Sequence, residues 1–335
     1  MPSRLTQLRT GSWDNPGKLK GLCYVPRDLP PGAPLVVVLH GCTQNADAYD
    51  RGSGWSYLAE RHGFALLYPE QSRENNANLC FNWFLSRHVQ RGRGEVASIH
   101  AMTQAMVADH RLDPARLFVT GLSAGGAMAS ALLASYPDVY AGGAIIAGLP
   151  YGCARDVRQA LDLMGGRIQP APETLAAKLR GASQHQGPWP RISVWHGSAD
   201  ATVVPSNADA IVRQWISVHA PPPEPSGTEN VGGHDRMTWA HPNGPVLIEK
   251  YLISGLGHGT PLMPGTGKGR SGEAGPHMLD AGISSTDRIA AFFGIAPETD
   301  QVAEPLRPAE PALKQPVSGV HKVIEDALRS AGLMR

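Results

Sequence analysis

The feature that most constrains this chain is the pentapeptide Gly-Leu-Ser-Ala-Gly at residues 121–125, a G-x-S-x-G sequence. An apolar run at residues 117–119 precedes it, and a stretch of small residues, 124–133, follows it. This order of strand, sharp turn and helix is what a nucleophile elbow needs, because the turn pushes the hydroxyl of Ser123 out at the top of a sheet. The N-terminus of the helix then directs its free N–H groups toward that hydroxyl. A pentapeptide alone is equally compatible with an ordinary glycine-rich turn, so the rest of the chain has to decide.

Apolar runs alternate with helical stretches along most of the chain, and this alternation predicts the fold class. Continuous runs rich in leucine and β-branched residues are typical of strands covered on both faces. They lie at residues 34–40, 64–68, 117–120, 143–147 and 192–196, and a sixth lies within 246–254. The clearest helical stretches are 55–61, 95–110, 124–136 and 207–218. We therefore expect an α/β fold with a mostly parallel sheet, helices on both faces, and a ligand site at the carboxyl ends of the strands.

Composition suggests one large domain with a tail. The 335 residues are 42% hydrophobic and 18% charged, enough for a sizeable core. Residues 296–318 have the proline- and alanine-rich composition of a linker, and apolar residues beyond it recur at helical spacing. We expect a catalytic domain over 1–295, a linker over 296–318 and an amphipathic helix over 319–335. That helix should dock on the catalytic domain or on a partner. One such partner would be a second copy of this chain in a homo-oligomer.

Several classes of protein do not fit the sequence. The net charge is +1 without a basic patch, so nucleic acid is not an expected partner. No window approaches 18 uninterrupted apolar residues, which argues against a membrane span and a membrane partner. The residues before Trp13 form no secretory leader, so the sequence as written predicts a cytoplasmic protein, and a secreted or periplasmic one if a leader is missing from it.

Two further patterns argue against a metal or phosphate site. The four cysteines form no C-x-x-C pair, and the simplest interpretation is four small, reduced, buried residues. The glycine-rich residues 265–269 would need glycine where Leu262 stands, and serine or threonine where Gly269 stands, to form a phosphate-binding loop. A flexible surface loop is the better interpretation.

A serine nucleophile also needs a base and an orienting carboxylate, which follow it along the chain in the order acid, then histidine. Asp200 comes just after the strand at 192–196 and is the candidate acid. The alternative interpretation is an aspartate that only stabilises a turn. His258, between two glycines after the strand at 246–254, is the candidate base. His196 precedes Asp200 at a strand end, where support of the backbone is more common, and His277 has no strand ahead of it.

The oxyanion hole should combine two backbone N–H groups. One is that of Ala124, the residue after the nucleophile. The second should come from the loop after the first strong strand, residues 40–44, and we assign it to Cys42. The His40 side chain is expected to brace this loop. The candidates for the substrate pocket are His40, Thr43, Gln44 and Trp83.

Taken together, these segments resemble the polyhydroxybutyrate depolymerase-like esterases of the α/β-hydrolase superfamily. The matching stretches are residues 39–44, 67–71, 80–84, 92–95, 119–128, 196–197 with Asp200, 257–261 and 278–285, and the likeness covers about residues 10–295. The resemblance implies a serine esterase without metal or organic cofactor, with Ser123 as nucleophile, Asp200 as acid and His258 as base. It also implies a disulfide between Cys42 and Cys80, as in secreted relatives, with Cα atoms roughly 4.4–6.8 Å apart.

The expected function is therefore hydrolysis of a carboxylic ester through an acyl-enzyme, on hydroxyalkanoate oligomers or other short-chain esters. A feruloyl or acetylxylan esterase is the close alternative, and a peptidase on the same fold belongs to a different class. A non-catalytic binding protein would be indicated by the loss of a triad residue, and none is missing. The tail after the linker is too short for a polymer-binding domain, so we expect a preference for small soluble esters over solid polyester.

Overall fold

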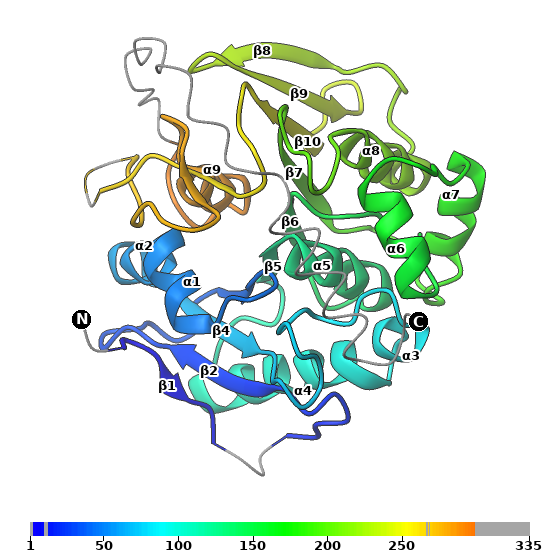
Figure 1. Cartoon of the computed structure of the whole chain (residues 1–335). Coiled ribbons are helices and arrows are strands. Elements are labelled where there is room, and N and C mark those ends of the chain that lie inside the picture. The colour runs from blue at the N-terminus through cyan, green and yellow to red at the C-terminus, as the bar shows by residue number, and fades with distance from the viewer. Residues whose placement is uncertain (1–2, 10–12, 266, 268, 299–335) are drawn as a thin grey trace.

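A computed structural model describes residues 3–9, 13–265, 267 and 269–298 (Figure 1). The predicted C-terminal helix, and all of the predicted linker except residues 296–298, lie outside these residues. The elements in chain order are β1 (Thr6–Gln7), β2 (Lys20–Tyr24), β3 (Leu35–Leu39), α1 (Ala46–Ser53), α2 (Trp55–His62), β4 (Ala65–Glu70), α3 (Ser86–Val89), α4 (Gly94–His110), β5 (Leu117–Leu122), α5 (Ala124–Ser135), β6 (Gly142–Ile146), α6 (Val157–Met164), α7 (Pro172–Arg180), β7 (Arg191–Gly197), α8 (Ser206–His219), β8 (Gly227–Val231), β9 (His234–Ala240), β10 (Val246–Ile253), β11 (Thr260–Leu262), β12 (Met278–Asp280) and α9 (Ser285–Phe292).

One ten-stranded sheet organises the chain, with the strand order β1-β2-β4-β3-β5-β6-β7-β10-β9-β8. The six central strands, β4 to β10 in this order, are parallel to one another. The strands at both edges pair antiparallel. Each predicted strand overlaps a central strand, so the expected α/β fold with a mostly parallel sheet is confirmed. The edge strands were not predicted.

Side chains that alternate along the strands fill two cores, one on each face of the sheet. In β3, Leu35, Val37 and Leu39 pack into the core covered by α4, α5, α6, α7 and α8. Val36 and Val38 point to the opposite core, covered by α1, α2 and α9 (Figure 1). Both faces of the centre are therefore apolar, which explains why its strands are continuous apolar runs and not alternating ones.

The parallel strands bring separate loops to one edge of the sheet. The segments that follow β3, β5, β7 and β10 carry Cys42, Ser123, Asp200 and His258, respectively. The carboxyl ends of parallel neighbours meet at the same edge, which is where ligands bind in such sheets. In the part of the chain with described coordinates, no helix has the length and apolar character needed to cross a membrane.

Candidate active site

The turn between β5 and α5 has the close backbone contacts that the G-x-S-x-G sequence predicts. A Cβ atom on Gly121 would lie 2.5 Å from the carbonyl carbon and oxygen of Gly125, and one on Gly125 would lie 2.4 Å from the Leu39 oxygen. Only glycine fits at either position. Ser123 itself adopts φ +57° and ψ −117°, an unfavourable conformation for a residue with a side chain. Its N–H donates to the Ile146 oxygen at 2.9 Å, which holds the turn against the next strand.

A chain of hydrogen bonds joins Ser123, His258 and Asp200. The His258 Nε2 atom lies 2.9 Å from the Ser123 Oγ, and His258 Nδ1 lies 2.7 Å from the Asp200 Oδ2. Burial alone would raise the pKa of Asp200, but the hydrogen bond and charge of His258 and the charge of His196 lower it overall. The ionised carboxylate accepts the Nδ1–H of His258, which leaves Nε2 free to accept the serine hydroxyl.

The other two candidate histidines have structural contacts. His196 is buried and donates from Nε2 to the Val203 oxygen at 2.7 Å, while the Asp200 Oδ2 lies 3.5 Å away. Its pKa is lowered by burial, and it supports the Asp200 loop, as expected from its position. His277 donates from Nδ1 to the backbone oxygen of His258 at 3.1 Å. Among the three candidates, His258 is the one placed against Ser123.

Two backbone N–H groups are free beside the nucleophile. Cys42 and Ala124 both line the cavity at Ser123, and neither N–H donates a hydrogen bond within the residues with described coordinates. The neighbouring amides do have acceptors, since the Thr43 N–H donates to the Asn78 oxygen at 2.7 Å. The site therefore offers the pair of N–H groups that an oxyanion hole needs.

His40 lies behind the oxyanion loop and not in the cavity. Its Nδ1 donates to the Gly41 oxygen at 2.7 Å, and its Nε2 accepts the N–H of Gln71 at 3.2 Å. These are the contacts that the predicted bracing role requires. The prediction that it lines the substrate pocket is wrong, because both ring nitrogens are occupied by backbone groups and the side chain is buried.

The cysteines divide into a bonded pair and two free thiols. Cys42 and Cys80 form a disulfide, with Cα atoms 4.2 Å apart, just below the expected range. Cys23 and Cys153 are free. The interpretation of all four as reduced residues is therefore wrong for the pair, and the bonded partner of the oxyanion loop is the one that the resemblance implied.

A cavity of about 590 Å³ opens at Ser123 and has two chemically different walls. One is apolar and includes a face of α6. The sequence analysis did not predict this face, although its apolar residues follow the helical spacing i, i+3, i+4 and i+7. The residues of this wall are Leu149, Val157, Ala160, Leu161 and Met164, with Trp83 and Phe84 nearby on the lining. The other is polar and includes Arg73, Asn75, Asn76, Asn78 and Arg87.

Of the four pocket candidates, Thr43, Gln44 and Trp83 line this cavity. In the described ranges, no cluster of three or more His, Cys, Asp or Glu side chains could hold a metal ion.

Comparison with known proteins places the chain in a family. Residues 22–221 match the family model described as esterase PHB depolymerase. The chain is 46% identical over 282 residues to poly(3-hydroxyalkanoate) depolymerase C of Paucimonas lemoignei, covering 84% of this chain and 68% of that protein. The chain belongs to the PHB depolymerase esterase family. The resemblance noted in the sequence is thereby confirmed.

Other members of this esterase group are named for a different ester. A probable acetylxylan esterase A of Aspergillus flavus is 32% identical over 259 residues, which are 73% of this chain and 81% of that protein. The solved acetyl xylan esterase from Aspergillus awamori shares the α/β-hydrolase fold, with a TM-score of 0.74 at 24% identity, covering 87% of this chain and 99% of that one. The family and the two relatives matched by sequence support hydrolysis of carboxylic esters as the reaction of this esterase.

Proposed function

We propose that this esterase works through a serine acyl-enzyme. Ser123 Oγ attacks the ester carbonyl while His258 Nε2 takes its proton, and the Asp200 carboxylate stabilises the imidazolium that forms. His258 then gives the proton to the departing alcohol, and later takes one from the water that releases the acid. The observation that carries this proposal is the continuous hydrogen-bonded chain from Asp200 to Ser123, which ends in a cavity.

The oxyanion that develops on the ester carbonyl would be held by the N–H groups of Cys42 and Ala124. A single such donor is worth about 10²–10³ in kcat, so this pair is expected to supply a large share of the rate enhancement. Both N–H groups are available before substrate binds, since neither has another acceptor in the described structure. The bond that breaks is the ester C–O bond, and water supplies the oxygen of the released acid.

We propose soluble hydroxyalkanoate oligomers as the substrate class. Such chains alternate alkyl branches with ester carbonyls, and the cavity pairs an apolar wall on α6 with a polar wall of asparagine and arginine side chains. The relative at 46% identity is named for a poly(3-hydroxyalkanoate). Solid polymer is not the proposed substrate, because adsorption needs exposed apolar area. Within the described coordinates, Ile168 is the one exposed large hydrophobic side chain.

An acetylated sugar polymer is the second candidate substrate. It is favoured by the relative named as an acetylxylan esterase and by the polar wall of the cavity, whose amide groups could equally meet sugar hydroxyls. For an acetyl ester, only the small acyl group would occupy the apolar wall. The two candidates therefore place the larger part of the substrate against different lining residues: the apolar ones for hydroxyalkanoate oligomers and the polar ones for an acetylated sugar polymer.

A substrate panel tests both candidates. We would measure kcat/KM on a 3-hydroxybutyrate dimer and trimer, acetylated xylo-oligomers, feruloyl esters and a stirred polyhydroxybutyrate suspension, with Ser123→Ala as the control for background. The proposal predicts the highest kcat/KM on the soluble hydroxybutyrate oligomers and none with the variant. A higher value on acetylated xylo-oligomers would replace the substrate class, and efficient clearing of the suspension would contradict the preference for soluble esters.

A further inference from the structure

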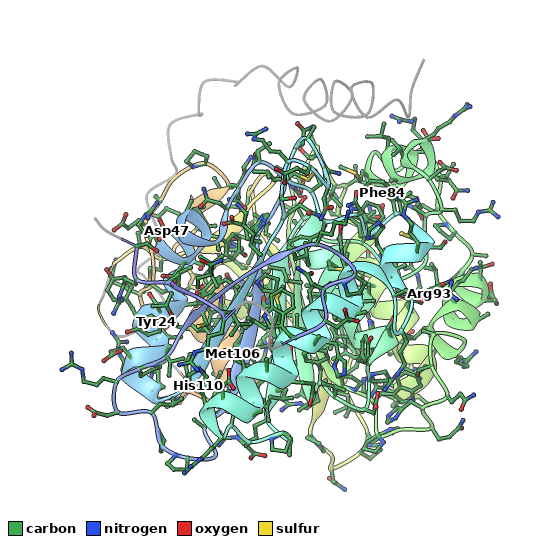
Figure 2. All side chains as sticks on the ribbon, turned by 90° about the horizontal axis from the view of Figure 1, so that it is seen from below. Tyr24, Asp47, Phe84, Arg93, Met106 and His110 are labelled. Carbon is green, nitrogen blue, oxygen red and sulfur yellow. A yellow bond between two sulfur atoms is a disulfide. The ribbon has the colours of Figure 1, made fainter. Side chains whose placement is uncertain are left out.

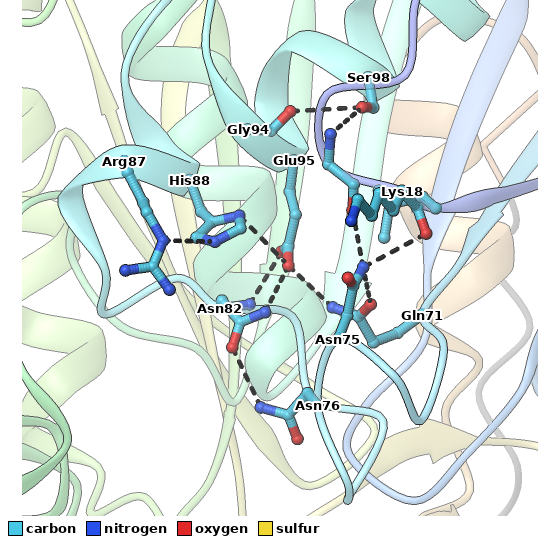
Figure 3. Close-up of polar contacts among 12 residues, drawn as sticks. Lys18, Gln71, Asn75, Asn76, Asn82, Arg87, His88, Gly94, Glu95 and Ser98 are labelled. Carbon is cyan, nitrogen blue, oxygen red and sulfur yellow. Dashed lines mark hydrogen bonds and ion pairs between the residues drawn. The ribbon is translucent and has the colours of Figure 1, made fainter. Parts of the chain in front are cut away.

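A buried carboxylate lies behind the oxyanion loop and takes no part in the proposed reaction. Glu95, the second residue of α4, is completely buried. Its oxygens accept the backbone N–H of Asn82 at 2.8 Å, the Asn82 side-chain amide at 2.6 Å and the Gln71 side-chain amide at 2.8 Å (Figure 3). A carboxylate that accepts three N–H groups from two separate segments ties those segments together.

The first connection runs from Glu95 through Gln71 to the oxyanion loop. The same Gln71 amide group also donates to the backbone oxygen of Cys80 at 3.1 Å. The Gln71 backbone N–H donates to His40 Nε2, and His40 in turn donates to the Gly41 oxygen. Gln71 therefore connects Glu95 to the residue before Cys42 and to the disulfide partner of Cys42.

The second connection runs through Asn82. Its side-chain oxygen accepts the amide of Asn76 at 3.1 Å (Figure 3). The Asn76 oxygen in turn accepts the backbone N–H groups of Asn78 and Cys80. The Asn78 carbonyl then accepts the N–H of Thr43 at 2.7 Å. The two connections thus reach the residues on both sides of Cys42, which lines the cavity.

The close contact between α3 and the first residues of α4 positions Glu95 next to Asn82 and Gln71. Gly94 has φ +55°, and a Cβ atom there would lie 2.4 Å from the Arg87 oxygen, so only glycine allows α3 and α4 to approach so closely. His88 of α3 accepts the Arg87 Nε–H at its Nε2, so its own proton is on Nδ1, 3.6 Å from Glu95 Oε1. Burial and then Arg87 lower the pKa of His88 to about 4, so His88 faces Glu95 as a neutral group.

We propose that Glu95 is the positioning residue of the oxyanion hole: its carboxylate holds the two segments that fix the Cys42 N–H. The inference rests on the proposed function of that N–H. A glutamine at the same position has one acceptor oxygen and would turn its own amide N–H groups toward donors, so it cannot replace the carboxylate.

The ionisation of Glu95 gives this proposal a pH signature. Burial raises the pKa of Glu95 to about 7, against the hydrogen bonds from Asn82 and Gln71 that lower it. The charged groups near it are Arg87 and, at low pH, His88, both from α3. Protonation would place a hydroxyl among N–H donors, so the loop should lose its support as the pH falls through this range. The acid side of the kcat–pH profile should then contain an ionisation that belongs to Glu95.

The test is the pH profile of kcat and KM for Glu95→Gln on a soluble ester. We expect kcat to fall ten- to a hundredfold at pH 8 with KM within about threefold of wild type, because Glu95 supports a donor used mainly in the transition state. One ionisation should disappear from the acid side. The matched control is Glu249→Gln, which alters another buried carboxylate, on β10, bonded to Ser193 and Arg236, and should keep the wild-type kcat and profile.

If Glu95→Gln does not fold, Gln71→Leu removes the connection to Cys80 and should give the same loss of kcat at constant KM. A folded Glu95→Gln enzyme with the wild-type kcat and the wild-type pH profile overturns the proposal, as does a change confined to KM. Ser123→Ala is measured in parallel. If it still hydrolyses the ester, the proposed function fails; if it is inactive and Glu95→Gln behaves as wild type, only the role of Glu95 fails.

Discussion

The two N–H groups of the candidate oxyanion hole lie side by side but are encoded in very different ways. Ala124 belongs to the elbow, whose shape depends on glycine contacts within residues 121–125 and with β3. Cys42 belongs to a loop that is held from behind by a disulfide, by Gln71 and Asn82, and by Glu95 more than 50 residues away in sequence. The elbow is thus specified by a short sequence, and the loop by contacts between distant segments.

Both regions hold a residue in an unfavourable backbone conformation. Ser123 has φ +57° and Thr43, a β-branched residue, has φ +65°. Such a residue costs of order 1–3 kcal/mol and persists only where its surroundings hold it. At Ser123 the surroundings are packed backbone atoms, which cannot yield. At Thr43 they are hydrogen bonds and one covalent link, so we expect changes at the elbow to affect folding, and changes to the hydrogen bonds around the loop to affect mainly the rate.

The largest effect is expected from Gly125→Ala. The added Cβ atom would lie 2.4 Å and 2.5 Å from the backbone oxygens of Leu39 and His40, neither of which can rotate away. We expect a loss of about 3 kcal/mol in the free energy of unfolding, measured by denaturant titration, together with loss of activity. Gly275→Ala is the control, because a Cβ there meets no atom within 4 Å. Equal stabilities of the two variants would contradict the rigid elbow.

Removing the disulfide should have the next largest effect on activity and an effect on stability at least as large as that of Gly125→Ala. The bond between Cys42 and Cys80 closes a loop with a sequence separation of 38, which corresponds to roughly 3–4 kcal/mol from chain entropy. We expect the double variant Cys42→Ser/Cys80→Ser to lose stability of this order and also kcat, with KM little changed. Cys153→Ser, at a free cysteine, is the control. A double variant with the wild-type kcat would show that the loop does not need this link.

The smallest effect is expected from Glu95→Gln on the pH dependence of the unfolding free energy. Because the pKa of Glu95 is raised to about 7 from an ordinary 4.5, the folded state holds this proton longer than the unfolded state. Burial of the neutral carboxyl group therefore stabilises the fold fully below about pH 4.5, although the loop then lacks its bonds to a carboxylate, and this stabilisation is lost as the pH rises through 7. The unfolding free energy of wild type minus that of Glu95→Gln should fall by roughly 2 kcal/mol between pH 5 and pH 8. His88, whose pKa is lowered from 6.5 to about 4, titrates in this window only in the unfolded state, and its contribution cancels in the difference because both proteins carry it. A difference that stays constant with pH would contradict the raised pKa.

Sequence reasoning succeeded where function and structure are encoded locally. The elbow, Asp200 after β7 and His258 after β10 all follow apolar runs that the buried parallel strands require. It failed at the sheet edge, because the residues Gly-Thr-Glu-Asn-Val of β8 have no apolar alternation and form a strand only by pairing with β9.

The residues that support the oxyanion loop could not be predicted from the sequence, for a related reason. Glu95 looks like an acidic residue in the first turn of a helix, a position that is usually solvated and favourable on the surface. Glu95 is buried because α3, Gln71 and Asn82 pack around it, and no local sequence pattern predicts contacts between such separate segments. His40 was assigned to the pocket for the same reason, since the N–H that occupies its ring belongs to Gln71.

The most direct test of the central claim, that Ser123 is a nucleophile activated by His258, is covalent labelling with a fluorophosphonate, followed by mass spectrometry of the peptides. We predict one adduct per chain, on the peptide that contains Ser123. It should be absent in Ser123→Ala and slower by several orders of magnitude in His258→Asn, which removes the base hydrogen-bonded to the serine. An adduct on a different serine, or undiminished labelling of Ser123→Ala, would contradict the account.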